Sequence, residues 1–330
     1  MLTKVVLETG DNRRQTVNRA IEALGDDFFD RCREAKTVFI KVNFFHHEYQ
    51  LASTHVDAVR GVVDAIRAFS QAKIYVGDAG YRGTKAAFRN FGYERLLDSY
   101  FDIELVDLND DDFVEGYSLK ADGSKNSIRR SKLAVEADLK ISLTPMKLHS
   151  DIAVSLSVDN WTVGTWIVPS RISATGKVWA RWPWLNEEGP WAHHASIMEL
   201  YRQVPCDVAV VDGIMAMEGD GPTHGTAVPL GVVVAGMDAV AVDAVSSTLM
   251  GVEPTDIGHL ALCAQEDLGA IALTNIDVPP MVMHEKMKQF ERPLHFEEKL
   301  RAWRTAAPSS KENNNYSPSR PTNGVRSGEI

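Results

Sequence analysis

The sequence predicts an α/β protein built on a mostly parallel sheet flanked by helices. Short apolar runs alternate with segments of helical period in the first 110 residues, and similar runs return after residue 207. Hydrophobic residues make up 44% of the 330-residue chain, which is the usual share for a folded protein. Strands and helices that alternate at this spacing indicate parallel pairing with right-handed crossovers.

The first third of the chain has a regular pattern. Strands are expected at 4–8, 37–44, 73–77 and 103–108, and helices at 16–33, after Thr54, and at 84–99. Thr54 is the expected N-cap of the second helix, because Asp57 stands three residues later as a capping-box partner.

The middle of the chain breaks this regularity after one further expected strand, 139–143. Six of the seven tryptophans fall between Trp161 and Trp191, in a stretch with no clear period. We expect an irregular, tryptophan-rich excursion or lid at 160–195 rather than layers of the core.

The regular pattern returns with expected strands at 207–211 and 230–235 and helices at 239–250 and 257–267. We therefore predict one α/β domain over residues 1–305, made of two halves, 1–150 and 200–305. Residues 306–330 are rich in Ser, Asn, Pro and Gly, which predicts a disordered C-terminal tail.

Charge and cysteine content exclude several classes of function. The formal net charge is -10, and such a surface disfavours nucleic acid and anionic membrane as partners. No apolar run approaches a membrane span, and the first residues lack a signal core, so we expect a cytoplasmic protein. The three cysteines are isolated from one another, which excludes an iron–sulfur cluster or a thiolate zinc site held within this chain.

Polar side chains end two of the expected strands. Lys41 and Asn43 end strand 37–44, and Asp78 opens the glycine-rich loop after strand 73–77. Ligands bind outside the carboxyl ends of parallel strands, so we predict that these three residues bind substrate. The alternatives are that Lys41 reaches water, although a lysine in an apolar run is costly unless paired, and that the loop is an ordinary turn, since it matches no phosphate-binding motif.

Lys147 and His149 follow strand 139–143 at alternate positions, so they face one side of an extended chain. A cation beside an imidazole can hold an anion while the imidazole moves a proton or binds a metal, which makes both candidate catalytic residues. An exposed loop pair is the alternative. The next polar and apolar alternation, 155–160, predicts a half-exposed strand with Asn160 at its exit as a further substrate-binding candidate.

The segment 211–225 passes from a buried strand into a loop dense in glycine and carboxylates. Asp212, Glu218 and Asp220 supply hard oxygen ligands, which predicts a divalent metal site for Mg, Mn or Zn, with His224 as a possible nitrogen donor. The alternative is a glycine-rich turn with incidental acids.

Two aspartates flank the start of the apolar helix 239–250. Asp238 is a natural N-cap. Asp243 lies inside the apolar helix and needs a partner, for which Lys41 or Lys147 is expected, and it is the third catalytic candidate.

In this order, these segments resemble the uncharacterised family called domain of unknown function 362. The resemblance covers about residues 38–270, and 217–225 followed by 238–243 is its most specific part. The other matching stretches are 38–43, 77–83, 90–93, 137–138, 141–149, 159–160 and 250–251. Many members carry a ferredoxin-like iron–sulfur domain, for which this chain has no cysteine set. Members often have a lysine where this chain has Asp159, so the resemblance implies a site with one cation fewer.

Two functions remain open at this point. The leading hypothesis is an enzyme acting on a small anionic molecule with a divalent metal: Lys41, Asn43 and Lys147 hold the anion, the three carboxylates hold metal or act as base, and His149 transfers the proton. The alternative is a non-catalytic metal-binding protein or an accessory protein for a redox partner. A remnant that keeps the fold without activity is a third possibility.

Overall fold

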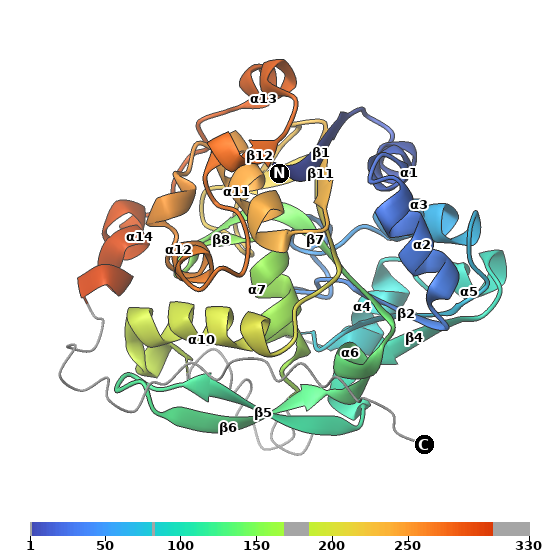
Figure 1. Ribbon diagram of the computed structural model, residues 1–330, viewed down its shortest axis with the longest axis horizontal. Helices are drawn as coiled ribbons and strands as arrows, with labels where there is room; N and C mark the ends of the chain where they lie inside the picture. Colours follow the sequence, from blue (N-terminus) through green and yellow to red (C-terminus); the bar gives the residue numbers. More distant parts are fainter. Residues whose placement is uncertain (1, 81–82, 168–184, 306–330) are drawn as a thin grey trace, which may run out of the picture.

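A computed structural model of the chain describes residues 2–80, 83–167 and 185–305. Its centre is a ten-stranded mixed sheet with helices on both faces, and a separate two-stranded hairpin lies below it in Figure 1. The predicted class, a mostly parallel sheet flanked by helices, is confirmed. The expected C-terminal tail and the central part of the tryptophan-rich stretch lie outside the described residues.

The sheet takes strands from both ends of the chain. Its order is β12-β1-β11-β9-β7-β2-β3-β4, with β10 paired to β9 and β8 to β7. The strands are β1 (Thr3–Thr9), β2 (Thr37–Lys41), β3 (Lys73–Asp78), β4 (Ile103–Asp107), β7 (Leu139–His149), β8 (Ala153–Ser155), β9 (Val208–Glu218), β10 (Thr226–Val228), β11 (Val232–Gly236) and β12 (Ile276–Asp277).

The centre of the sheet is parallel, because β9, β7, β2, β3 and β4 run in one direction. On the other side, β11 is antiparallel to both β9 and β1. The carboxyl ends of the five parallel strands therefore meet at one edge, where an α/β sheet usually binds its ligand.

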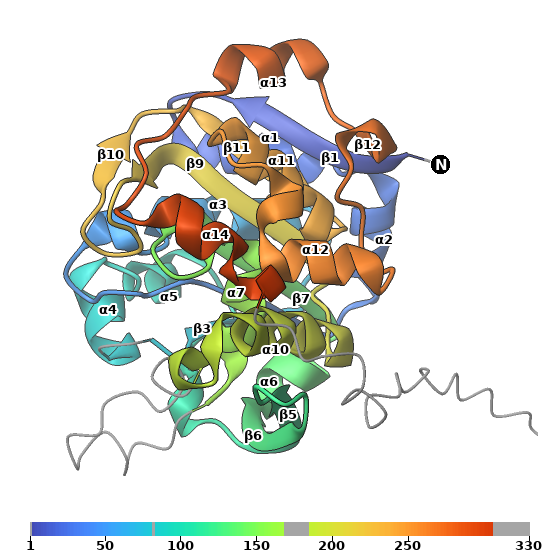
Figure 2. The same ribbon diagram turned by 90° about the vertical axis from the view of Figure 1, so that its left-hand side faces the viewer.

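The helices cover the two faces as separate layers, which Figures 1 and 2 show from two sides. One face carries α1 (Arg13–Glu22), α2 (Asp26–Glu34), α3 (Val56–Arg67), α4 (Thr84–Asn90) and α5 (Arg95–Ser99). The other carries α6 (Lys132–Glu136), α7 (Ser157–Thr162), α10 (Gly189–Gln203), α11 (Ala239–Leu249), α12 (Gly258–Gln265), α13 (Pro280–Lys286) and α14 (Phe296–Thr305).

The strand residues divide between two hydrophobic clusters by alternation. In β2, Val38 and Ile40 pack with α1 to α5, whereas Phe39 points to the opposite cluster beside Trp161. A residue period of two is what a strand buried on both faces requires.

Five local expectations were wrong, and each has a physical reason. The helix expected at 84–99 is two helices, α4 and α5, because Gly92 adopts φ 72° between them. The helix expected at 16–33 is two helices, because Gly25 adopts φ 88° between α1 and α2, a conformation that favours glycine. Thr54 does not cap α3. His55 accepts from the Asp57 amide instead, and the Thr54 hydroxyl donates to the Leu143 carbonyl.

The other two lie in the middle of the chain. Segment 155–160 is not a half-exposed strand but the end of β8 followed by the buried helix α7. Trp161 belongs to the core rather than to an excursion, since its side chain is fully buried and its indole donates to the Val204 carbonyl at 2.8 Å.

The antiparallel hairpin of β5 (Phe113–Leu119) and β6 (Lys125–Ser131) was not predicted, and neither was α10, which packs on it. Among the residues that the structure describes, no helix is long and apolar enough to cross a membrane.

Candidate functional site

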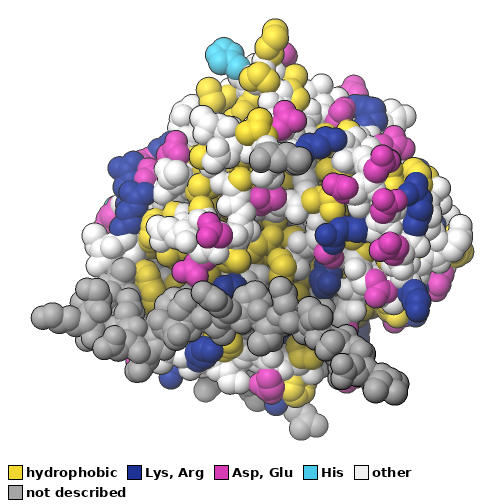
Figure 3. Space-filling view, in the orientation of Figure 1, with side chains coloured by type: hydrophobic (Ala, Val, Ile, Leu, Met, Phe, Trp, Pro, Cys, Tyr) yellow, Lys and Arg dark blue, Asp and Glu magenta, His cyan; other side chains and the backbone are white. Residues whose placement is uncertain are grey.

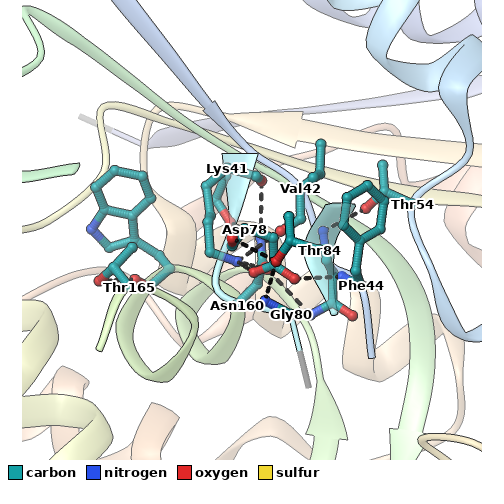
Figure 4. A network of polar contacts seen from close by, with 12 residues as sticks. Lys41, Val42, Phe44, Thr54, Asp78, Gly80, Thr84, Asn160 and Thr165 are labelled. Carbon is teal, nitrogen blue, oxygen red and sulfur yellow. Dashed lines mark hydrogen bonds and ion pairs between the residues drawn. The ribbon is translucent and has the colours of Figure 1, made fainter. Parts of the chain in front are cut away.

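A buried polar network lies at the carboxyl ends of β2, β3 and β7, against α7. Lys41 ends β2 and Asp78 ends β3, while Asn160 comes from α7, 119 residues after Lys41 in the sequence. Figure 4 shows these three side chains pointing toward one another. The sequence predicted each of them separately, and the fold brings them together.

The Lys41 ammonium is held by three oxygens. It lies 2.5 Å from the Asp78 carboxylate and donates to the Asn160 side-chain oxygen at 2.9 Å and to the Val42 carbonyl at 2.7 Å. Gly164 makes room for it, because a Cβ at that position would lie 2.5 Å from Nζ. Lys41 is therefore a buried, fixed cation rather than a solvent-exposed strand end.

Lys147 joins the same network from β7. Its amine donates to the Asn43 side-chain oxygen at 2.7 Å and to the Ala52 carbonyl at 2.8 Å. Asn43 in turn donates to the side-chain oxygen of Asn160 at 3.2 Å, so the two asparagine side chains connect Lys147 to Lys41. Lys41 and Lys147 are both fully buried.

Two carboxylates act on the two lysines. Asp78 pairs with Lys41, and the charges of Asp159 and Asp78 act on Lys147. Burial lowers the pKa of the Lys147 ammonium from 10.5 to about 7, which the two carboxylates oppose and the Lys41 charge reinforces. An uncharged Lys147 amine is therefore well populated near neutral pH.

Asp243 does not pair with a lysine, which corrects the partner expected from the sequence. Its two oxygens accept from the amides of Ser157 and Val158, each at 2.8 Å. Burial raises the pKa of this carboxyl to about 8, against the effect of the two hydrogen bonds. Asp243 thus fixes the start of α7, the helix that carries Asp159 and Asn160.

A pocket of about 550 Å³ adjoins the network where β7 and β9 end. It is lined by Phe45, His149, Ser150, Asp151, Asn186, Asp220, Gly221, Pro222, Thr223 and His224. The Phe45 ring stands between pocket and network: its centroid lies 5.4 Å from the Lys147 amine and 6.4 Å from the His149 ring centroid. Lys147 and His149, which alternate along β7, thus both lie near the Phe45 ring.

His149 is an uncharged imidazole with an assignable tautomer. Its Nδ1 accepts from the Asp151 amide at 3.0 Å, so in the neutral ring the proton sits on Nε2. Burial lowers the pKa of His149 to about 4; Asp151 opposes the shift, and Lys147 and Lys299 add to it. At neutral pH this residue is suited to donate a hydrogen bond.

The three predicted metal ligands are not gathered. Asp212 pairs with Arg13 at 2.7 Å, and Glu218 accepts from the Glu291 amide at 3.0 Å, roughly 20 Å further along the strand. Asp220 lines the pocket. Within the described parts of the chain, no group of three or more His, Cys, Asp or Glu side chains could hold a metal ion. These three carboxylates therefore do not fit a shared metal ion.

A histidine cluster behind the pocket was missed. His194 of α10 and His259 of α12 stack, with 5.3 Å between ring centroids and 3.1 Å between their Nδ1 atoms. His193 lies next to them, and the charge of His149 acts on all three. A histidine doublet inside a buried helix was the one available signal.

The fold and this site define a class: a three-layer α/β protein with a buried lysine network and a pocket at the carboxyl edge of its sheet. The chain belongs to the family described as "Domain of unknown function (DUF362)", whose model matches residues 38–248. The resemblance seen in the sequence is thereby confirmed.

Two individual proteins are similar to parts of the chain. The thylakoid-associated protein sll1697 of Synechocystis sp. is 32% identical over 200 residues, which is 60% of this chain and 56% of that protein. The lactate racemase apoprotein of Thermoanaerobacterium thermosaccharolyticum superposes with a TM-score of 0.49 and 14% identity, over 75% of this chain and 57% of that one. The chain thus matches little more than half the length of either protein.

Proposed function

We propose that the chain is an enzyme that binds a small anionic molecule in the pocket between the ends of β7 and β9. The observation that carries the proposal is that the pocket and the lysine network share a wall, formed by Phe45 and His149. A pocket beside convergent polar groups with shifted pKa values is typical of an active site.

Each group has a proposed part. The His149 Nε2–H donates a hydrogen bond to the substrate, and Lys147 supplies an uncharged amine that takes up a proton or attacks the substrate. Lys41 provides a fixed positive charge in the buried network next to Lys147. Asp220 is the pocket carboxylate available as a base, because Asp151 already pairs with Lys299 at 2.9 Å.

The test is thermal unfolding with a panel of small carboxylates and phosphates. We expect at least one anion to raise the Tm of the wild type, because a ligand that binds only the folded state stabilises it. Thr223→Trp, which fills the pocket, should abolish the shift. Thr226→Trp, on the neighbouring strand β10 but outside the pocket lining, should keep it. If no anion shifts the wild type, or if Thr223→Trp responds as the wild type does, the proposal is wrong.

A non-catalytic accessory role is the second candidate. Met281, in α13, and Met287, directly after it, are 84% and 49% exposed, and apolar side chains are visible at the top of Figure 3, where α13 lies. Exposed apolar side chains that gather in one place suit contact with a partner. A complete lack of anion binding would favour this role.

A further inference from the structure

The two buried lysines differ in how many acceptors surround the nitrogen. Three oxygens contact the Lys41 nitrogen, one for each hydrogen of an ammonium group. Hydrogen bonds to two oxygens, Asn43 Oδ1 and Ala52 O, hold the Lys147 nitrogen. Two acceptors satisfy both hydrogens of an uncharged amine and leave its lone pair without a hydrogen-bond role. The geometry of Lys147 therefore suits a nucleophile, and that of Lys41 a permanent cation.

The direction of approach follows from Phe45. Its ring lies over the Lys147 amine and also lines the pocket. The Phe45 ring thus contacts both the pocket and the amine, and its rotation is the proposed route by which a small molecule in the pocket reaches the amine. The Lys41 cation, paired with Asp78, acts on Lys147 from within the network and disfavours protonation of the amine.

We propose that the substrate is a small carboxylic acid with an aldehyde or ketone group, and that Lys147 condenses with this carbonyl to form an imine. This inference rests on the proposed function, because it uses the same pocket. The nitrogen lone pair forms the new C–N bond as the carbonyl π pair moves to oxygen. The two amine hydrogens then leave with that oxygen as one molecule of water, so the step needs no oxidant or reductant.

The experiment traps the imine on the full-length protein. Glyoxylate is added near pH 7 with sodium cyanoborohydride, which reduces imines to stable amines, and modified lysines are quantified by peptide mass spectrometry. We expect Lys147 to be modified about tenfold faster than the exposed Lys85, because a much larger fraction of its amine is uncharged. Lys147→Arg should remove this site and leave Lys85 modified as before.

Three variants and one control, Phe113→Ala, test the route and the role of the Lys147 charge. Phe45→Ala should speed the modification of Lys147, whereas Phe113→Ala, on the distant hairpin, should not. Thr223→Trp should slow it. Asp159→Asn removes a carboxylate that raises the pKa of Lys147, so it should shift the pH midpoint of modification downward.

Two results would overturn the inference in distinguishable ways. If Lys147 stays unmodified in both the wild type and Phe45→Ala while Lys85 reacts, the carbonyl chemistry is wrong, and anion binding in the pocket can still stand on its own test. If Thr223→Trp does not slow the modification, the amine is not reached through the pocket and this inference is wrong; if Thr223→Trp also keeps the anion-induced rise in Tm, the proposed function is wrong as well.

Discussion

At the scale of single residues, two buried ionisable side chains, Lys41 and Asp243, have different kinds of partner: a carboxylate for the lysine and backbone amides for the aspartate. Lys41 and Asp243 were both recognised because a charged residue interrupts an apolar run. Lys41 did find a carboxylate, Asp78, from the next strand of the sheet. Asp243 found backbone amides of α7, a helix that the sequence pattern had predicted as a strand. Amide donors leave no mark in a sequence, so this partner could not be predicted.

Replacement of Asp243 by alanine should therefore destabilise the protein, because the start of α7 loses its hydrogen-bond acceptors. It leaves the buried amides of Ser157 and Val158 without acceptors, and we expect a loss of about 3 kcal/mol in the free energy of unfolding. Urea unfolding at pH 5 measures it, with the exposed Asp122→Ala as the control that should change little.

The pH dependence of this loss has a defined sign. The pKa of Asp243 is raised from 3.8 to about 8 in the folded protein, so the folded state holds this proton more tightly than the unfolded chain. The contribution of Asp243 is thus full below pH 3.8 and declines as the pH rises through 8. Asp243→Ala should cost more at pH 5 than at pH 8.5, and an equal or larger cost at pH 8.5 would contradict this account.

At the scale of secondary-structure elements, periodicity predicted the buried strands and the apolar helix α11 well, with Asp238 as the N-cap that the structure confirms. Periodicity did not predict a helix boundary that depends on a single residue, as the boundary between α1 and α2 depends on Gly25. It also failed for α10, because the helix is buried nearly all round and carries His193, His194 and Glu199 among its buried residues. A helix without a polar face gives no helical period in its hydrophobicity.

The contact between α10 and α12 should weaken in mild acid. His194 accepts from the backbone amide of His259, and burial lowers the pKa of both imidazoles well below 6.5. The charge of His149 acts in the same direction on both, together with that of His193 on His194 and that of His194 on His259. The pKa of His193 is lowered to about 3 and that of His149 to about 4. The folded state therefore binds these protons less readily than the unfolded chain.

For histidines with lowered pKa values, stability is complete above pH 6.5 and is lost as the pH falls below it. We expect the urea midpoint to decrease between pH 7.5 and pH 5, and His259→Phe to reduce that decrease. His284→Phe, on the exposed helix α13, is the matched control and should leave it unchanged. If His259→Phe has the same pH dependence as the wild type, the cluster does not govern acid sensitivity.

At the scale of the whole molecule, the class of fold followed from the alternation of strands and helices, but the order of strands did not. The chain leaves the sheet after β4, makes the β5–β6 hairpin, and re-enters at the centre as β7. Nothing in the hydrophobic pattern of 139–149 specifies that this strand pairs with β2 and β9. The sequence predicts which residues end strands, and therefore which residues are candidates for the site. It does not predict which of these strand ends meet, because that depends on the strand order.

That strand order joins the two predicted halves of the chain in one sheet, and it leads to a prediction about unfolding. The first half supplies β4, β3, β2 and β7, and β7 pairs directly with β9 of the second half; β1, also from the first half, pairs with β11 and β12 of the second. Loss of either half would leave a central strand, β7 or β9, at an open edge of the sheet. We therefore expect the two halves to unfold in one cooperative transition.

Two buried cysteines on opposite faces of the sheet report on the two halves separately. Cys32 lies in α2 and Cys263 in α12, and both are inaccessible in the folded protein. Brief labelling with a thiol reagent at increasing urea concentrations, read by peptide mass spectrometry, should give the same midpoint for both and for the far-UV circular dichroism. Exposure of Cys32 at a clearly lower urea concentration than Cys263 would mean that residues 1–150 unfold on their own. The continuous sheet would then be a contact between two domains rather than the core of one.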